Sequence, residues 1–326
     1  MLTEDSVLAY LIDRAILPPD QPASAWPLAG GVSNIVLAVD CGDQALVVKQ
    51  SLPQLRVETV WKAKQERTLN EARALSLAGA MTPDRVPELI DVDDTNFVLV
   101  ISRAPCNWTE WKRLLLAGEI DPAVAGVLGG VLGSWHAGTS SDRVVMASLD
   151  DPEAFDQLRV GPYYRTVAEK IPEFATQIGA VVNRMTSTRS CLVHGDYSPK
   201  NILVGATSVW VVDFEVAHLG DPVFDVAFML SHLILKSLHM PERSAALQQA
   251  GREFLAGYHA QTGAALDWNY LAEQVGCLLL ARVAGQSPVE YLDDRGRQAA
   301  ERAGRDLLQQ RSLELTQLLA LTKETS

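Results

Sequence analysis

The chain of 326 residues contains only four cysteines, and no two of them form a Cys-x-x-Cys pair. Single, scattered thiols at Cys41, Cys106, Cys191 and Cys277 favour free cysteines in a reducing compartment over a disulfide framework or a zinc site. The chain begins MLTEDSVLAY, which lacks the basic segment that opens a secretory signal. We therefore expect a cytoplasmic protein.

Long hydrophobic runs and excess positive charge are also missing. The most apolar stretch, VFDVAFMLSHLILKSL, is interrupted by Asp225, His232 and Lys236, and a membrane span needs roughly 18 uninterrupted apolar residues. Lys and Arg number 28 against 40 Asp and Glu, so the net charge is −12. Such a charge disfavours binding to nucleic acid or to an anionic membrane, and we expect neither as a partner. An acidic surface suits cationic ligands, but it also serves solubility alone.

What the chain does contain is an ordinary globular composition, with 48% hydrophobic and 21% charged residues. A helix is expected at 3–17, followed by a proline-rich connector. Residues 28–102 then show β-type runs at 28–40, 45–51, 86–92 and 97–102, with a helix over 61–80. These runs predict a small antiparallel sheet with one main helix.

The sequence pattern changes near residues 102–107, where helical patterns begin to dominate. Only CLVHGD, NILVG and VWVVDF still have β character. The helical patterns lie at 108–118, 121–138, 172–185, 221–239, 242–260, 268–285 and 295–322. We therefore predict an α+β chain with three parts: an N-terminal helix and connector (1–27), a β-rich lobe (28–103) and a large helical lobe (104–326).

The stretch HGDYSPKNIL places Asp196 and Asn201 five residues apart, and Asp213 follows in VWVVDFE. Asp and Asn oxygens are hard ligands that suit Mg²⁺. Because Mg²⁺ usually completes its octahedron with water and substrate phosphates, a phosphate-bearing ligand is the expected partner. The alternative is a plain turn, which Pro199 and the Asn and Asp side chains also favour.

The order and spacing match the kinase pattern His-x-Asp, four residues, Asn, and a later Asp-Phe. That pattern requires an earlier Lys–Glu ion pair, for which Lys49 ends a strand run and Glu71 lies within the next helix. Glu66 is the rival to Glu71. Asp221 is the expected N-cap of the helix at 221–239, and Asp225 in its first turns is expected to have buried polar partners.

Together, HGDYSPKNIL and VVDFEVAHLGDPVFDVA resemble the aminoglycoside phosphotransferase/choline kinase-like superfamily of small-molecule kinases, over about residues 28–237. The resemblance implies a protein kinase-like two-lobe fold, with ATP or GTP and Mg²⁺ bound between the lobes. It implies Asp196 as the base that accepts or orients the hydroxyl proton, with Asn201 and Asp213 as Mg²⁺ ligands. The other implied roles are phosphate binding by Lys49, held by Glu71; phosphate cover by Gly31 and Ser33; adenine contact at Ile101 and Arg103; and support of the catalytic loop by His194 and Asp225.

Several points stay open at this level. Tyr163, Tyr164 and Arg165 in a helical insert (142–189) are candidate acceptor contacts, as is Arg282, although ordinary packing explains each equally well. The acceptor is a small-molecule hydroxyl on an aminoglycoside, amino alcohol, sugar or hydroxyacyl compound. A nucleotide-binding pseudokinase and a kinase acting on protein are the competing interpretations.

Overall fold

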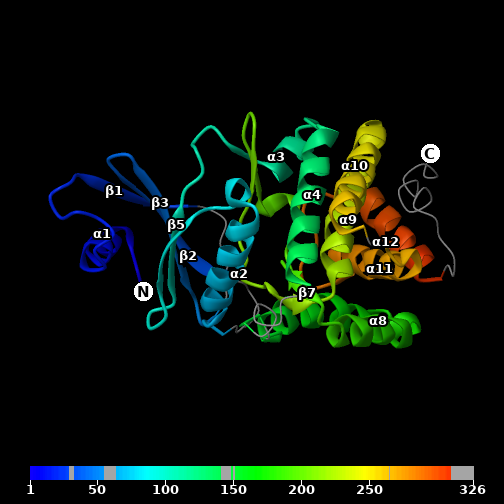
Figure 1. The fold of residues 1–326 in the computed structure, drawn as a ribbon. Coiled ribbons are helices and arrows are strands. Elements are labelled where there is room, and N and C mark those ends of the chain that lie inside the picture. Colours follow the sequence, from blue (N-terminus) through cyan, green and yellow to red (C-terminus); the bar gives the residue numbers. More distant parts are fainter. Residues whose placement is uncertain (29–32, 55–63, 141–147, 150, 264, 310–326) are drawn as a thin grey trace.

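The computed structural model describes residues 1–28, 33–54, 64–140, 148–149, 151–263 and 265–309. A mainly antiparallel sheet with two helices forms one end of the molecule, and a large group of helices forms the other (Figure 1). We call the first part, up to β5, the N-lobe and the rest the C-lobe. The predicted α+β class, with a small antiparallel sheet and a larger helical part, is confirmed.

The N-lobe sheet has five antiparallel strands in the order β1-β2-β3-β5-β4. Their bounds are β1 (Ala23–Pro27), β2 (Asn34–Cys41), β3 (Gln44–Ser51), β4 (Leu89–Asp93) and β5 (Val98–Ser102). Between β3 and β4 lie α2 (Arg67–Met81) and the short η1 (Pro83–Arg85). The sequence placed 23–27 in a connector, but this segment pairs with β2 as an edge strand. A proline at its end is compatible with that edge position.

Side chains alternate between the two faces of this sheet, as strand geometry requires. Val98 and Val100 of β5 pack into the core that α1 (Glu4–Asp13) covers, whereas Leu99 and Ile101 pack on the side of α2. Lys49 of β3 pairs with Leu99, so it lies on the α2 face. Val7 and Leu11 of α1 complete the other core, so this helix packs directly on the sheet.

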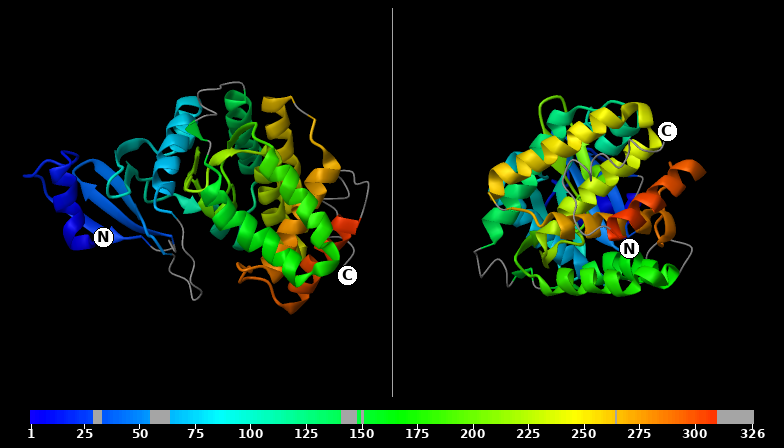
Figure 2. Two further views of the ribbon diagram at one scale, coloured as in Figure 1. Left: turned by 90° about the horizontal axis from the view of Figure 1, so that it is seen from below. Right: turned by 90° about the vertical axis from the view of Figure 1, so that its right-hand side faces the viewer.

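The C-lobe is built around helices α4 (Pro122–Thr139), α9 (Pro222–His239), α10 (Ser244–Thr262) and α11 (Trp268–Ala284). Glycines let α4 and α10 approach closely: a Cβ on Gly129 would lie 1.9 Å from the Phe254 carbonyl oxygen. Figure 2 shows these helices stacked beside one another, away from the sheet. The close backbone contact offsets the roughly 1 kcal/mol that each glycine costs inside a helix.

Shorter elements connect these helices and carry the catalytic segments. They are β6 (Thr109–Glu110), α3 (Trp111–Leu116), α6 (Glu153–Phe155), η2 (Asp156–Arg165), α7 (Thr166–Lys170), η3 (Pro172–Phe174), α8 (Ala175–Ser187), β7 (Cys191–Val193), η4 (Pro199–Asn201), β8 (Ile202–Val204), β9 (Val209–Val211), β10 (His218–Gly220), η5 (Pro241–Arg243) and α12 (Asp294–Gln309). β8 pairs with β9, and β7 pairs with β10. The two short ladders therefore hold the segments before and after the two motifs side by side.

Element ends differ from the predictions in a few places. The helix expected at 61–80 begins at Arg67, and 61–63 lie outside the described residues. The C-terminal helix expected at 295–322 is α12 to Gln309, and the rest also lies outside. Within the ranges described above, no helix is long and apolar enough to cross a membrane.

Candidate active site

A cleft of about 890 Å³ lies where the N-lobe sheet faces the C-lobe. The sheet contributes Val36, Val47 and Lys49, and the two C-lobe motifs contribute Asp196, Asn201 and Asp213. Among the other lining residues are Ser33, Ile101, Arg103, Arg159, Tyr163, Lys200, Leu203, Val212, Glu215, Phe228, His232, Arg282, Gln286, Ser287 and Glu290. The side chains predicted from distant parts of the sequence therefore meet around one cavity.

Lys49 joins the two lobes. Its Nζ lies 2.6 Å from Glu71 Oε1 and 2.7 Å from Asp213 Oδ1. Burial alone would lower the Lys49 pKa, but the Asp213, Glu71 and Glu215 carboxylates outweigh it and raise the pKa above its ordinary value. Lys49 is therefore a permanent cation at neutral pH. Glu71, and not Glu66, is its helix partner; Glu66 is the exposed N-cap of α2.

Asp213 has a left-handed backbone, with φ +73°. A non-glycine residue in that region carries local strain of about 1–3 kcal/mol, which persists only where the surroundings impose it. The ion pair with Lys49 is one such constraint. Burial raises the Asp213 pKa, but the neighbouring Lys49 and Lys200 ammonium groups reverse this and hold it below its usual range. Asp213 is thus a carboxylate throughout the physiological range.

The backbone of the HGD segment is fastened by Asp225 from α9. Asp225 is fully buried, and its carboxylate accepts hydrogen bonds from the N–H groups of His194 at 2.7 Å and Gly195 at 2.9 Å. Gly195 has φ +76°, and a Cβ there would lie 2.6 Å from the Val216 carbonyl oxygen, so only glycine fits. Asp225 therefore contacts the backbone of this segment directly. His136 of α4 is a further neighbour of Asp225 that the sequence did not indicate.

His194 supports the same loop from within. Its Nδ1 accepts a hydrogen bond from the Asp196 N–H at 3.1 Å, and its ring packs against Trp135 and Phe214. Burial lowers the His194 pKa, although nearby carboxylates oppose this. A neutral, buried imidazole suits the predicted structural role.

Asp196 is surrounded by cations at one carboxylate oxygen. Arg159 Nη2 lies 2.9 Å and Lys200 Nζ 2.8 Å from its Oδ2, and Asn201 Nδ2 donates to the same atom at 2.8 Å. Burial raises the Asp196 pKa, but Arg159 and Lys200 outweigh this effect and lower it. Arg159, from η2, was not predicted from the sequence, because it belongs to no motif and its partner Asp196 lies 37 positions away.

The side chains of Asn201 and Asp213 suit Mg²⁺. The Asn201 amide nitrogen donates to Asp196, which leaves its Oδ1 as a ligand oxygen, and Lys49 contacts only the Oδ1 of Asp213. Nowhere in the described ranges do three or more His, Cys, Asp or Glu side chains form a metal site by themselves. A hard cation held by one amide and one carboxylate oxygen, with phosphates and water completing its shell, fits this set.

Glu215 was named only as part of the motif, and the structure gives it contacts across the cleft. It accepts hydrogen bonds from Ser33 Oγ at 2.9 Å and Asn34 Nδ2 at 3.0 Å. Arg67, which is almost fully buried, adds an ion pair at 3.2 Å and donates to the Ser33 carbonyl oxygen. Glu215 thus links the loop before β2 to the C-lobe. Gly31, the other predicted loop residue, lies outside the described residues.

At the end of strand β5, Ile101 and Arg103, the two residues predicted to contact adenine, line the cleft. The N–H of Arg103 donates to the Ala45 carbonyl oxygen at 2.8 Å, and its guanidinium pairs with Asp40. Its backbone donor is therefore occupied. Ala104, which also lines the cleft, is the next residue along this edge.

The four candidate acceptor contacts divide into two pairs. Tyr163 and Arg282 line the cleft and contact each other, with Arg282 Nη1 donating to the Tyr163 hydroxyl at 3.1 Å. Tyr164 and Arg165 do not line it, which corrects the prediction for both. Tyr164 is fully buried against Gln274, and Arg165 pairs with Asp156 at the surface. Successive residues of a helix point in different directions, so only one of the adjacent tyrosines can face the cavity.

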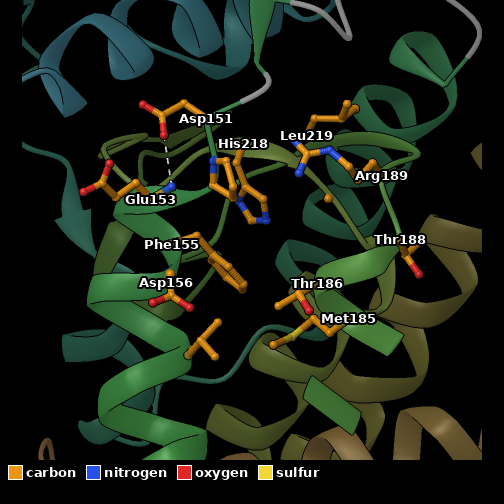
Figure 3. Close-up of a pocket in the computed structure, with 13 residues that line it drawn as sticks. Asp151, Glu153, Phe155, Asp156, Met185, Thr186, Thr188, Arg189, His218 and Leu219 are labelled. Carbon is orange, nitrogen blue, oxygen red and sulfur yellow. Dashed lines mark hydrogen bonds between the residues drawn. The ribbon is translucent and has the colours of Figure 1, made fainter. Parts of the chain in front are cut away.

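A second pocket of about 420 Å³ lies elsewhere in the C-lobe (Figure 3). Phe155 and His218 stack there at 4.0 Å, and Asp151 accepts a hydrogen bond from the Glu153 N–H. Burial lowers the pKa of His218 to about 4. The pocket shares no lining residue with the cleft and contains none of the predicted site residues.

The model of the Phosphotransferase enzyme family matches residues 25–268, a range that covers most of the N-lobe sheet, a large part of the C-lobe and the HGD and DFE segments. The chain belongs to this family. Methylthioribose kinase from Bacillus cereus (strain G9842) is 22% identical over 90% of this chain and 86% of its own length. Methylthioribose kinase 2 from Oryza sativa subsp. japonica is 26% identical over 63% of this chain and 55% of its own.

Solved structures show the same fold. The macrolide 2′-phosphotransferase from Brachybacterium faecium superposes with a TM-score of 0.55, over 95% of this chain and all of that one, at 16% identity. The amicoumacin kinase complex with AMP-PNP and Ca²⁺ has a TM-score of 0.58 over 97% of this chain at 14% identity. The phosphotransferase fold with two lobes, expected from the motifs, is thereby confirmed, and the chain is a small-molecule kinase with a hydroxyl acceptor.

Proposed function

We propose that this kinase transfers the γ-phosphate of ATP or GTP, with Mg²⁺, to a small hydroxyl compound in the cleft. The observation that carries the proposal is the position of Lys49, which contacts both Glu71 and Asp213 in the cavity that Asp196 lines. Phosphoryl transfer depends on positioning and charge neutralisation, and these are the charges it requires.

The nucleotide half of the cleft lies against the sheet. Val36 and Val47 from the N-lobe and Leu203 and Val212 from the C-lobe provide apolar surfaces for a base. Because the Arg103 N–H is already bonded, we place the polar contact to the base at Ala104. Lys49 binds phosphate oxygens, Glu71 holds Lys49 in place, and Asn201 and Asp213 hold the Mg²⁺, which neutralises phosphate charge when bound.

The acceptor hydroxyl lies at Asp196. Its oxygen attacks the γ-phosphorus, a new O–P bond forms, and the bond from that phosphorus to the bridging oxygen breaks, so that the nucleoside diphosphate leaves. Asp196 orients the hydroxyl and accepts its proton late in the transfer, when the proton has become acidic. Arg159 and Lys200 hold the Asp196 carboxylate in its ionised form.

Thermal unfolding with ATP or GTP, with and without Mg²⁺, tests this proposal. A nucleotide at a hundredfold excess over its Kd should stabilise the fold by about 2.7 kcal/mol. The stabilisation should require Mg²⁺ and disappear in Asp213→Ala. Absence of any shift at millimolar nucleotide would rule out the proposal, and a shift without turnover on any hydroxyl compound would indicate the pseudokinase alternative. Turnover is tested on a panel of hydroxyl compounds, which includes methylthioribose because methylthioribose kinases are among the relatives.

A further inference from the structure

The acceptor half of the cleft is cationic, although the whole chain carries a net charge of −12. The cations Arg159, Lys200 and Arg282 line this half, together with His232, whose pKa burial lowers so that its imidazole is neutral. The lining contains four carboxylates: Asp196, Asp213, Glu215 and Glu290. Asp213 and Glu215 bind partners on the N-lobe side, Asp196 is matched by two cations, and Glu290 is exposed. Positive charge is therefore in excess where the acceptor binds.

Arg282 has only neutral partners. Its Nη1 donates to the Tyr163 hydroxyl at 3.1 Å and to Ser287 Oγ at 3.0 Å. Its buried Nε has no acceptor in the described part of the chain. A guanidinium presents several donors in one plane, a geometry that matches a carboxylate or phosphate. Arg282 thus has donors available for a ligand anion.

Lys236 lies close to Arg282 behind this wall. It lies one turn beyond His232 on α9 and is fully buried. Within the described part of the chain, no hydrogen bond or ion pair reaches its ammonium group, and its one aromatic contact is the Tyr291 ring at 5.3 Å. The Tyr291 hydroxyl is itself buried without a partner. Burial disfavours the charged form of such a lysine, and groups of this kind cluster at functional sites.

From these contacts we infer that the acceptor carries an anionic group, a carboxylate or a phosphate, which binds to Arg282 and Ser287 while its hydroxyl lies at Asp196. This inference rests on the proposed kinase function and narrows its substrate class. The guanidinium groups of Arg159 and Arg282 lie 5.6 Å and 5.8 Å from the centroid of the same Tyr163 ring, so one small molecule can contact both of them. Amino alcohols and aminoglycosides are disfavoured, because their ammonium groups would face uncompensated positive charge.

Matched acceptor sets test the inference, with the release of ADP or GDP as the readout. One set is gluconate, glucose and glucosamine; a second is 4-hydroxybutyrate, 1,4-butanediol and 4-amino-1-butanol. Ribose 5-phosphate against ribose separates a phosphate from a carboxylate requirement. We expect the anionic member of a set to exceed the cationic one in kcat/KM by about tenfold or more. Arg282→Gln should raise the KM of the anionic member by about tenfold and change that of the neutral member little.

Two variants complete the design. Ser287→Ala, a milder change, should shift the same KM in the same direction, and Arg302→Gln, at an exposed site on α12, should change none. A second readout needs no turnover: gluconate or ribose 5-phosphate should stabilise the wild type, with and without nucleotide, and should fail to stabilise Arg282→Gln. Preference for neutral or cationic acceptors, equal losses for all acceptors in Arg282→Gln, or no Arg282-dependent stabilisation overturns the inference. Loss of the nucleotide shift is a separate result, since it concerns the kinase proposal alone.

Discussion

The Asp225 carboxylate accepts a hydrogen bond from the backbone N–H of His194 at 2.7 Å, 31 positions earlier in the chain. Through this contact the start of α9 holds the backbone that carries Asp196. The carboxylate is fully buried and also accepts the Gly195 N–H. It therefore supplies the acceptors for two consecutive backbone donors.

Asp225→Asn should destabilise the protein and misplace the loop. An amide can accept only through its one oxygen and would direct its NH₂ group at a second donor. Losing hydrogen bonds to a charged acceptor and leaving a buried N–H unpaired costs about 2–4 kcal/mol. Urea unfolding should show this loss together with reduced turnover. Asp20→Asn, at an exposed position, is the matched control and should stay within about 0.5 kcal/mol. Equal stability of both variants would mean that Asp225 does not hold the loop.

Glu71→Gln should weaken nucleotide use, whereas Glu66→Gln should not. The Glu71 carboxylate is buried and positions Lys49 at 2.6 Å. A neutral amide leaves Lys49 paired with Asp213 alone, so its ammonium group moves away from the phosphates. We expect the nucleotide KM to rise by about tenfold or more. Both variants remove one carboxylate from α2, which makes Glu66→Gln a close control. A higher nucleotide KM in Glu66→Gln, with no change in Glu71→Gln, would contradict the site as described.

Asp196→Asn should keep the fold and nucleotide binding but lose turnover. Asn is of the same size and retains hydrogen bonds, but it cannot accept the acceptor proton. Since general-base contributions are about 10²–10⁴-fold, kcat should fall by that factor while the nucleotide Kd changes less than about tenfold.

The Asp196 pKa is held below its ordinary value of 3.8, so titration of Asp196 should not reduce the wild-type rate between pH 8 and 6. Steady-state kinetics beside nucleotide titration checks these expectations. Full activity of the Asn variant would make HGDYSPKNIL a structural turn.

Because Lys236 is buried, we expect the free energy of unfolding to depend on pH in an unusual way. Burial, followed by the charges of Lys112 and Arg282, lowers its pKa from 10.5 to about 7, and Glu110 opposes the shift. The charged or titratable groups that act on it from its own and neighbouring elements are His232, Arg282, Lys112, Glu110 and Tyr291. Between pH 7 and 10.5 the unfolded chain binds more protons at this residue than the folded one. The free energy of unfolding therefore rises with pH through that window.

Lys236→Met should remove this rise. Below pH 7 the full penalty of the buried ammonium is present, so the Met variant gains most over the wild type there, and the gain fades toward pH 10. At about 1.4 kcal/mol per pKa unit the upper limit of the gain is about 5 kcal/mol. Urea unfolding between pH 6 and 10 is the measurement, with Lys170→Met at an exposed site as the control. Parallel pH profiles for wild type and Lys236→Met would show that Lys236 titrates normally.

The motifs themselves were readable from the sequence because their information is local. Strand alternation places Lys49 on one face of β3, and helical spacing allows Glu71 to point at it. The separation of Asp196 and Asn201 sets their contact within one short loop. Residue type and spacing were enough to expect Mg²⁺ and a phosphate-bearing ligand, and the family resemblance that these motifs carry implied a nucleotide and a kinase-like fold.

What only the tertiary structure decided are the partners from other elements. No sequence pattern near Asp196 predicts its contact with Arg159. None predicts that Arg67 and Ser33 are partners of Glu215. The sequence also does not tell which of the adjacent residues Tyr163 and Tyr164 faces the cavity. The sign of charge in the acceptor half is the clearest case: although the sequence is acidic, its fold brings the cations Arg159, Lys200 and Arg282 together around one part of the cleft. Net charge is a sum over the chain, whereas the field in a cavity depends on which side chains packing brings within a few ångströms of it.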